Sequence, residues 1–269
     1  MLTSFIYHDI VEDSRHDESG FAGAAASSYK LDGPLFEAHL AALRPATSGG
    51  SMDVFDPGSL CAAAIGRERR VLLTFDDGGA SAVHPTADLL EEHGLKGLFF
   101  IATDYIGTKA FVSDDDIRAL HRRGHGIGTH SASHPLRMAA CSPAELDAEW
   151  RTSIARLTDL LGQPVAVASV PGGGYARSVA EAARRCGVNV LFTSEPVSRV
   201  RLVEDCYVLG RYSVRRTTSA NELRMLASGN VAALLRQRFV WGAKKALKRL
   251  GGRSWLALRA KYYETRSPR

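Results

Sequence analysis

The sequence predicts an α/β fold in which parallel strands alternate with helices around a barrel. Short apolar runs typical of buried strands recur after residue 70, separated by segments of helical periodicity. This alternation is typical of a parallel sheet covered by helices. Polar motifs directly follow several of the predicted strands, where a (β/α) barrel carries its chemistry. With 269 residues, 45% of them hydrophobic and 23% charged, the chain is long enough for one such domain.

Each element follows from a local pattern. Seven strands are predicted, near residues 3, 71, 97, 126, 165, 189 and 208, the last one over 207–214. Helices are predicted over 35–43, 84–93, 113–123, 143–161, 177–186 and 219–227. Ser113 and Ser142 are expected N-caps, because each is followed three residues later by an acid. Residues 11–33 are predicted to form a surface loop over the site, and residues 45–60 a second loop.

Two adjacent carboxylates follow the apolar run 71–73, in the stretch Thr74-Phe75-Asp76-Asp77-Gly78. Carboxylates at the end of a buried strand are costly unless something uses them. Neighbouring side chains of a strand point to opposite faces, but a turn at Gly78 and Gly79 would bring both acids to one rim. One acid would then bind a metal while the other handles protons.

A pair of histidines supplies the matching half of this site. His130 and His134 are four residues apart, a spacing that suits one divalent ion on a helical turn or in a loop. Together with Asp77 they would supply one oxygen and two nitrogens. An open coordination position would remain for water, as a catalytic zinc site requires, so we expect a divalent metal with Zn²⁺ as the favoured ion. His121 and His125 are expected at the surface.

With these two stretches the sequence resembles the polysaccharide deacetylase family, the NodB-homology hydrolases of carbohydrate esterase family 4, which remove acetyl groups from amino sugars. The resemblance rests on residues 74–78 and 130–134 and on the weaker motif 170–175, and it covers about residues 1–215. It implies a distorted seven-stranded (β/α) barrel, in agreement with the seven predicted strands. It also implies that Asp76 is the general base and Asp77 the metal ligand.

Two positions depart from the family pattern. The third motif usually has an arginine two residues before its proline, where this chain has Ser169. The final motif usually carries a histidine, the general acid, where this chain has Arg211. The segment Ile6-Tyr7-His8 has the form of that final motif, as in the circularly permuted poly-N-acetylglucosamine deacetylases. We therefore expect His8 to protonate the leaving amine, the alternative being a core histidine on an edge strand.

Further site residues are predicted with alternatives. Arg211 or Arg177 is a candidate for the missing arginine, although an ordinary surface charge is the favoured interpretation of Arg177. Pro171 and Gly172 either bring a backbone N–H to the oxyanion or form only a tight loop. Tyr175 is a candidate for the sugar subsite. Thr129 or Ser131 is expected to orient the two histidine rings.

Charge is unevenly distributed along the chain. Residues 236–269 hold eleven Lys or Arg and one acid, whereas the whole chain has a net charge of only +5. We therefore predict a deacetylase domain over 1–230 and a basic amphipathic tail over 231–269, which would contact an anionic membrane. Nucleic acid is a less favoured partner, since no recognition motif accompanies the charge. The N-terminus lacks the pattern of a signal peptide, so a cytoplasmic protein, peripheral at the inner membrane face, is expected.

These patterns predict a metal-dependent hydrolase that removes N-acetyl groups from an amino sugar in a saccharide. The substrate would be a lipid-linked or exopolysaccharide intermediate. A deformylase acting on a lipid-linked amino sugar is an alternative with the same chemistry. A catalytically inactive carbohydrate-binding relative is a second alternative, although the presence of both aspartates and both histidines argues against it.

Overall fold

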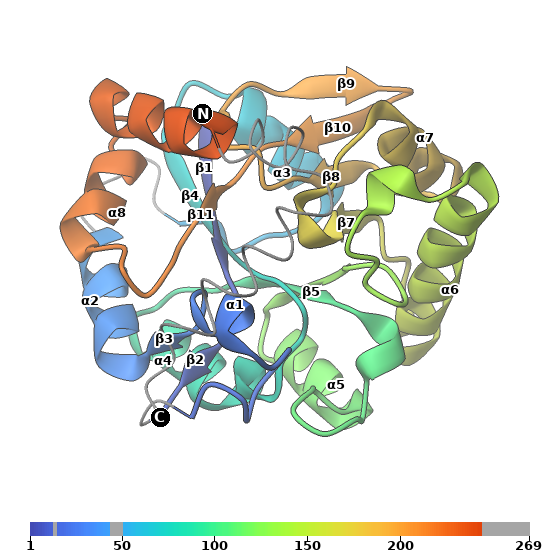
Figure 1. The fold of residues 1–269 in the computed structure, drawn as a ribbon, viewed down its shortest axis with the longest axis horizontal. Helices are drawn as coiled ribbons and strands as arrows, with labels where there is room; N and C mark the ends of the chain where they lie inside the picture. Colours follow the sequence, from blue (N-terminus) through green and yellow to red (C-terminus); the bar gives the residue numbers. More distant parts are fainter. Residues whose placement is uncertain (13–14, 44–50, 244–269) are drawn as a thin grey trace.

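The computed structural model describes residues 1–12, 15–43 and 51–243. A curled parallel sheet forms its centre, in the order β11-β1-β4-β5-β6-β7-β8-β10-β9 (Figure 1). The strands are β1 (Leu2–Tyr7), β4 (Arg70–Phe75), β5 (Leu98–Ile101), β6 (Gly126–Thr129), β7 (Val167–Ser169), β8 (Val190–Phe192), β9 (Arg201–Val203), β10 (Cys206–Leu209) and β11 (Tyr212–Ser213). All pair in parallel except β9, which is antiparallel to β10. The predicted α/β fold of the barrel type is confirmed, and its seven predicted strands occur in the predicted order.

Helices surround this sheet, with α2 and α8 on the left of Figure 1, α5 at the bottom and α6 and α7 on the right. They are α2 (Gly33–Leu43), α3 (Pro57–Ile65), α4 (Asp88–Glu92), α5 (Asp114–Arg122), α6 (Pro143–Leu161), α7 (Arg177–Arg185) and α8 (Ala220–Ala227). Both predicted capping boxes are present, at Ser113 and Ser142. Short elements β2 (Ile10–Val11), α1 (Ala24–Ser27) and β3 (Leu31–Asp32) interrupt the predicted loop 11–33.

The two faces of the sheet bury different clusters, because successive side chains of a strand alternate. In β4, Val71 and Leu73 pack outward with the helices α2, α5 and α8. Leu72 packs inward, in a cluster that also contains Leu98 and Phe100 of β5. This inner layer fills the space enclosed by the curled sheet.

Helix α3 corrects the prediction that residues 45–60 form only a loop. Asp56 caps this helix by accepting a hydrogen bond from the backbone N–H of Ser59, and Pro57 occupies its first turn. Leu60 of α3 belongs to the inner cluster, together with strand residues such as Leu72. Phe55, just before the helix, lies so close to Gly126 at the start of β6 that a Cβ there would be 2.6 Å from its ring. The segment therefore packs against the inner layer where the strands begin.

The last predicted strand, over 207–214, is divided in the structure. Its first half, β10, pairs with β8, whereas its second half, β11, pairs with β1 at the opposite end of the sheet order. Gly210 and Arg211 form the crossing between the two halves, and a Cβ on Gly210 would be 2.3 Å from two backbone carbonyls. The crossing brings the last strand, β11, beside the first strand, β1. It also places Arg211 inside the curled sheet.

The predicted boundary at residue 230 stays a prediction. Residues 231–243 are helical, and Ala233 in this helix joins the outer core with 8% of its surface exposed. Residues 244–269, which carry most of the predicted basic tail, lie outside the described residues. In the part of the chain that the structure describes, no helix has the length and apolar character needed to cross a membrane.

Candidate active site

The candidate site lies where the parallel strands end. Tyr7 of β1 is paired with Phe75 of β4, so His8 and Asp76 are the next residues of two adjacent strands. The backbone N–H of Asp76 donates to the Tyr7 carbonyl at 3.0 Å, which keeps the two ends together. Alternation along each strand gives His8 and Asp76 the same face as the inner residue Leu72. The register of the sheet thus brings the first residues of the chain to the aspartate motif.

Asp77 departs from the strand conformation. Its φ of 78° lies in the left-handed region, and Gly78 follows with φ 82°. A non-glycine residue in this region is strained, and such strain persists only where the surroundings enforce it. The turn therefore begins one residue earlier than the predicted Gly78–Gly79 turn. It allows the second aspartate to face the same rim as the first.

Asp77, His130 and His134 converge as predicted, with one donor atom from each lying within 4.8 Å of the others. Oδ1 of Asp77 is 3.4 Å from Nε2 of His130 and 3.3 Å from Nε2 of His134. The Nδ1 of His130 lies 3.0 Å from the Ser169 carbonyl, which can only accept, so Nδ1 carries a proton and Nε2 is the ring atom that faces Asp77. One carboxylate oxygen and two imidazole nitrogens suit a divalent ion such as zinc. These residues fit the metal that the sequence predicts.

Burial and charge oppose each other at this cluster. Burial acts to raise the pKa of Asp77, but its hydrogen bonds with His130 and His134 outweigh this and hold that pKa well below its ordinary value. Burial likewise acts to lower the pKa of His130, yet the charges of Asp76 and Asp77 outweigh it and raise that pKa. The ionised carboxylate of Asp77, next to two imidazole rings, thus favours the binding of a cation.

Asp76 is held by Arg211 rather than by a residue of the third motif. Nη1 and Nη2 of Arg211 donate to the two carboxylate oxygens of Asp76 at 2.7 and 2.8 Å, a bidentate ion pair. Arg211 is fully buried, and it also donates to the hydroxyls of Thr74 and Ser169. Burial acts to raise the pKa of Asp76, but the charges of Arg211 and His130 and the hydrogen bonds from Arg211 together outweigh burial and lower that pKa. Asp76 is therefore a carboxylate at neutral pH.

Arg177, the other arginine considered from the sequence, lies elsewhere. Its side chain is 65% exposed at the start of α7, where it pairs with Glu181 and Glu204. Ser169 occupies the position of the usual arginine, and its hydroxyl lies between Arg211 and Asp76. The guanidinium group thus reaches the aspartate from the crossing between β10 and β11.

His8 is half-buried at this rim. Its ring packs against Tyr29, with 5.0 Å between the ring centroids. Its Nδ1 is buried and has no hydrogen-bond partner among the described residues. Its charge is among the influences that lower the pKa of Asp76 and of Asp77 against the opposing effect of burial. The structure therefore brings His8 close to both carboxylates.

The third motif is less closely connected to this cluster. Pro171 and Gly172 follow β7 in a single turn, and Gly172 has φ 62° with its Cα facing the Leu136 carbonyl. Tyr175 packs against a separate hydrophobic cluster formed by residues of α6 and α7. Its ring lies under the Arg201 guanidinium, 4.8 Å from it. No hydrogen bond or ring contact joins Tyr175 to the candidate metal ligands within the described residues. Its predicted place in a sugar subsite stays a prediction.

Ser131 and Thr129 act on the backbone of the histidine loop. The Ser131 hydroxyl accepts from the backbone N–H of His134 at 3.2 Å, and the Thr129 hydroxyl accepts from the N–H of Ser131 at 3.1 Å. Ser131 and His134 both have positive φ, at 67° and 56°, which makes this segment a loop rather than a helical turn. These hydroxyls shape the loop, whereas the Ser169 carbonyl orients the His130 ring.

A buried polar network fastens the loop 15–23 to the aspartate turn, and the sequence did not predict it. Oδ1 of the buried Asp9 accepts from the hydroxyls of Ser19 at 2.5 Å and of Ser81 at 3.0 Å. Lys30 is buried beside Asp9, with Nζ 4.0 Å from Oδ2, and donates to the Phe21 carbonyl at 2.7 Å. In the sequence, the network is visible only as charged and hydroxyl residues within a polar stretch. Because such residues are usually exposed, they do not indicate a buried network.

This network places an aromatic side chain against a metal ligand. The Phe21 ring lies 4.6 Å from the His134 ring, measured between centroids. Tyr105 and Phe111 complete an aromatic group around Phe21, at 4.8 and 5.1 Å. The predicted covering of the site by the loop 11–33 therefore has a physical basis in these contacts.

His125 is not at the surface, contrary to the sequence-based expectation. It is 2% exposed, accepts a hydrogen bond from the backbone N–H of Gly97, and lies 3.2 Å from Glu91. Burial is the main cause that lowers its pKa to about 4. His125 is a neutral structural residue that links the starts of β5 and β6.

Comparison with known proteins identifies related sequences. The family model described as polysaccharide deacetylase matches residues 64–191. YxkH of Bacillus subtilis, whose own assignment as a polysaccharide deacetylase is provisional, is 26% identical over 147 residues, or 55% of this chain and 52% of YxkH. The peptidoglycan-N-acetylglucosamine deacetylase PgdA of Listeria monocytogenes is 35% identical over 68 residues, or 25% of this chain and 14% of PgdA. The chain thus spans about half the length of YxkH and a smaller part of PgdA.

Solved structures share the fold. The deacetylase PplD of Streptococcus pyogenes, in complex with acetate, has a TM-score of 0.69 at 18% identity. The superposition covers 84% of this chain and 97% of the PplD chain. IcaB from Ammonifex degensii has a TM-score of 0.66 at 19% identity, with the same coverage of 84% and 97%. At such identities the similarity establishes a common fold. These comparisons show that residues 64–191 match the polysaccharide deacetylase family and that the chain shares the fold of solved deacetylase structures.

Proposed function

We propose that this chain is a metal-dependent hydrolase that removes N-acetyl groups from an amino sugar within a saccharide. The observation that carries the proposal is the arrangement of two adjacent aspartates with different partners. Asp77 faces the imidazole nitrogens of His130 and His134, whereas Asp76 is paired with Arg211 beside them. One carboxylate would thereby hold a cation, and the other would stay ionised next to it.

Amide hydrolysis needs an activated water, a stabilised oxyanion and a proton for the leaving amine. When bound, a divalent cation lowers the pKa of a coordinated water towards about 7 and polarises the acyl carbonyl. Asp77, His130 and His134 would hold that cation, with Zn²⁺ the favoured ion for this donor set. Asp76 would accept the proton of the attacking water, since its lowered pKa keeps it ionised and its Oδ2 lies 3.9 Å from Nε2 of the proposed ligand His130.

Arg211 would hold the Asp76 carboxylate in one orientation through its two hydrogen bonds, so that the base is aligned before the substrate arrives. His8 would donate the proton to the leaving amine, because it lies near both carboxylates and its Nδ1 has no other partner in the described chain. A backbone N–H after Pro171, such as that of Gly172, would stabilise the oxyanion, and Tyr175 would contact the sugar.

The substrate in this proposal is an N-acetylated saccharide, either lipid-linked or an intermediate of a longer glycan. The related PgdA is named for peptidoglycan N-acetylglucosamine, which supports an N-acetylated amino sugar. An enzyme at the cytoplasmic side of the membrane would meet such a lipid-linked intermediate. The eleven Lys or Arg of residues 236–269 support a place at an anionic membrane surface.

The test is acetate release from a panel of N-acetylated oligosaccharides, combined with metal analysis. Asp76→Asn is expected to keep the metal and to lower turnover about 10²- to 10⁴-fold, the usual contribution of a general base. Asp115→Asn is the matched control, because the Asp115 side chain is 93% exposed on α5. His8→Ala should likewise retain the metal and lose turnover.

Four outcomes would contradict parts of the proposal. Unchanged turnover in Asp76→Asn would exclude Asp76 as the general base, and unchanged turnover in His8→Ala would exclude His8 as the general acid. Release of formate instead of acetate would identify the deformylase alternative. Binding of the saccharides without release of either acid would favour an inactive carbohydrate-binding relative.

A further inference from the structure

An exposed apolar stripe runs along the helix of residues 231–243. Val231, Leu235 and Phe239 are 68%, 56% and 78% exposed, and their spacing of four residues puts them on one face. Ala233 on the opposite face of the helix, and Leu234 at the edge of the stripe, pack on the protein against the outer core. Large apolar side chains aligned in this way on a packed helix are typical of a binding surface.

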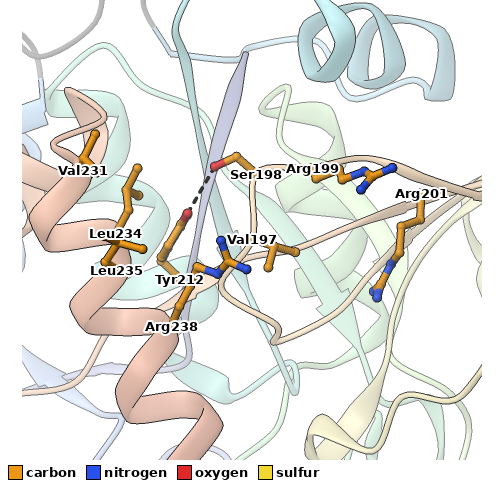
Figure 2. Close-up of a pocket in the computed structure, with 9 residues that line it drawn as sticks. All are labelled: Val197, Ser198, Arg199, Arg201, Tyr212, Val231, Leu234, Leu235 and Arg238. Atoms are coloured by element: carbon orange, nitrogen blue, oxygen red, sulfur yellow. Dashed lines mark hydrogen bonds between the residues drawn. The ribbon is translucent and has the colours of Figure 1, made fainter.

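A positively charged pocket of about 540 Å³ lies beside this stripe (Figure 2). The helix forms one wall through Val231, Leu235 and Arg238, and the segment 197–201 forms the other through Arg199 and Arg201. Three arginines and no acidic residue are found among the described residues that line it. The pocket therefore suits an anionic group next to an apolar one.

Two of these arginines are available to a ligand. Arg201 is held by an ion pair with Glu195 and by its position over the Tyr175 ring. Arg199 and Arg238 are exposed, and no ion pair engages either of them within residues 1–12, 15–43 and 51–243. A guanidinium group is well suited to phosphate oxygens, to which it donates two hydrogen bonds at once.

We propose that this face, formed by the stripe Val231–Leu235–Phe239 and the arginines Arg199 and Arg238, docks on the surface of an anionic phospholipid bilayer. The apolar side chains would enter the boundary between headgroups and acyl chains, and the arginines would bind lipid phosphates. Charge complementarity favours this partner, because the sequence from 236 to 269 carries eleven Lys or Arg and one acid. The surface is separate from the candidate metal centre, so the inference does not depend on the proposed function.

Sedimentation of the full chain with vesicles tests the proposal. Vesicles of mixed phosphatidylglycerol and phosphatidylcholine are compared with vesicles of phosphatidylcholine alone. The double variant Leu235→Ser/Phe239→Ser is expected to bind the anionic vesicles at least tenfold more weakly. Arg199→Gln/Arg238→Gln should weaken binding about fivefold for each arginine removed.

Two controls separate surface effects from folding. Ile65→Ser alters an apolar side chain on α3 that is 68% exposed, as Val231 is, and should bind as the unmodified chain does. Phe239→Leu keeps an apolar side chain and should retain most of the binding. All variants change exposed residues, so their thermal unfolding temperatures should match that of the unmodified chain.

The alternative partners give different results, each of which would overturn the proposal. Vesicle binding that is unaffected by both double variants would place the contact in the remainder of the chain. Equal binding to the neutral phosphatidylcholine vesicles would show that the contact does not need anionic lipid. Binding to random-sequence duplex DNA that depends on the arginines but not on the stripe would indicate a nucleic-acid surface. A dimer that Leu235→Ser/Phe239→Ser dissociates, without any vesicle binding, would assign the stripe to a second copy of the chain.

Discussion

Replacing Arg211 by glutamine tests how the candidate base is held. The substitution removes both charge-assisted hydrogen bonds to Asp76, at 2.7 and 2.8 Å, while the carboxylate stays only 6% exposed. Removing one partner of a buried ion pair costs about 3–5 kcal/mol, because the remaining charge is left uncompensated. Two charge-assisted hydrogen bonds at about 1.5–3 kcal/mol each give a similar figure. We therefore expect a loss of about 3–5 kcal/mol in the free energy of unfolding at pH 7.

The loss should depend on pH. In the unmodified chain the pKa of Asp76 is lowered, so its stabilisation is present above the ordinary carboxyl pKa of about 4 and is lost as the pH falls through the lowered value. Without Arg211, burial would raise the pKa of Asp76, and the folded protein would take up a proton at higher pH. The difference in stability between the two proteins should thus shrink as the pH falls from 7 towards 4.5.

Urea unfolding at pH 7 and pH 4.5 measures this difference, since urea does not screen charges. Arg177→Gln is the matched control, and it should change stability little because that arginine is exposed. Turnover in Arg211→Gln should fall about 100-fold, with the acidic limb of its pH profile moved to higher pH. A stability loss that is equal at both pH values, or no larger than that of the control, would refute the role of Arg211 in keeping Asp76 ionised.

Three further substitutions test other parts of the site. Asp77→Asn should lower the bound divalent metal, measured by elemental analysis after dialysis, and undiminished metal would remove Asp77 from the ligand set. Gly79→Ala should cost about 1–3 kcal/mol in denaturant unfolding, because the added Cβ would lie 1.9 Å from Oδ1 of Asp9, whereas Gly33→Ala, with open space around it, should cost less. Lys30→Met should destabilise the protein by about 3–5 kcal/mol at neutral pH, since it leaves the buried Asp9 without its cation. That loss should shrink in acid, because the burial-raised pKa of Asp9 lets it take up a proton, and a pH-independent loss would contradict this reasoning.

The site residues that lie in contiguous motifs were accessible from the sequence. The aspartates and histidines follow buried strands, and parallel strands end at one edge, so their meeting in space follows from the strand order. The same alternation that places Leu72 inside also places Asp76 and His8 there. Helix α3 was missed because Asp56-Pro57-Gly58 has the composition of a turn, although Asp and Pro also begin helices.

Contacts between distant segments were not accessible in the same way. Nothing in the local pattern around Gly210 indicates that the chain crosses here from β10, which pairs with β8, to β11, which pairs with β1. This crossing nevertheless brings Arg211 to Asp76. Lys30 and Asp9 are ordinary charged residues in a polar stretch, and only the folded loop shows that they are buried together. His125 was expected at the surface for the same reason, because burial depends on what packs against a side chain.

By itself, the sequence determined the alternation of strands and helices, the positions of the candidate metal ligands and the replacement of two family residues by Ser169 and Arg211. These features depend on the spacing and type of neighbouring residues, which local periodicity and side-chain chemistry reveal. Only the tertiary structure decided which cation accompanies Asp76, how the loop 15–23 is fastened over the site, and which helix face stays exposed. Those outcomes depend on pairings between residues far apart in the chain, for which no local pattern carries information.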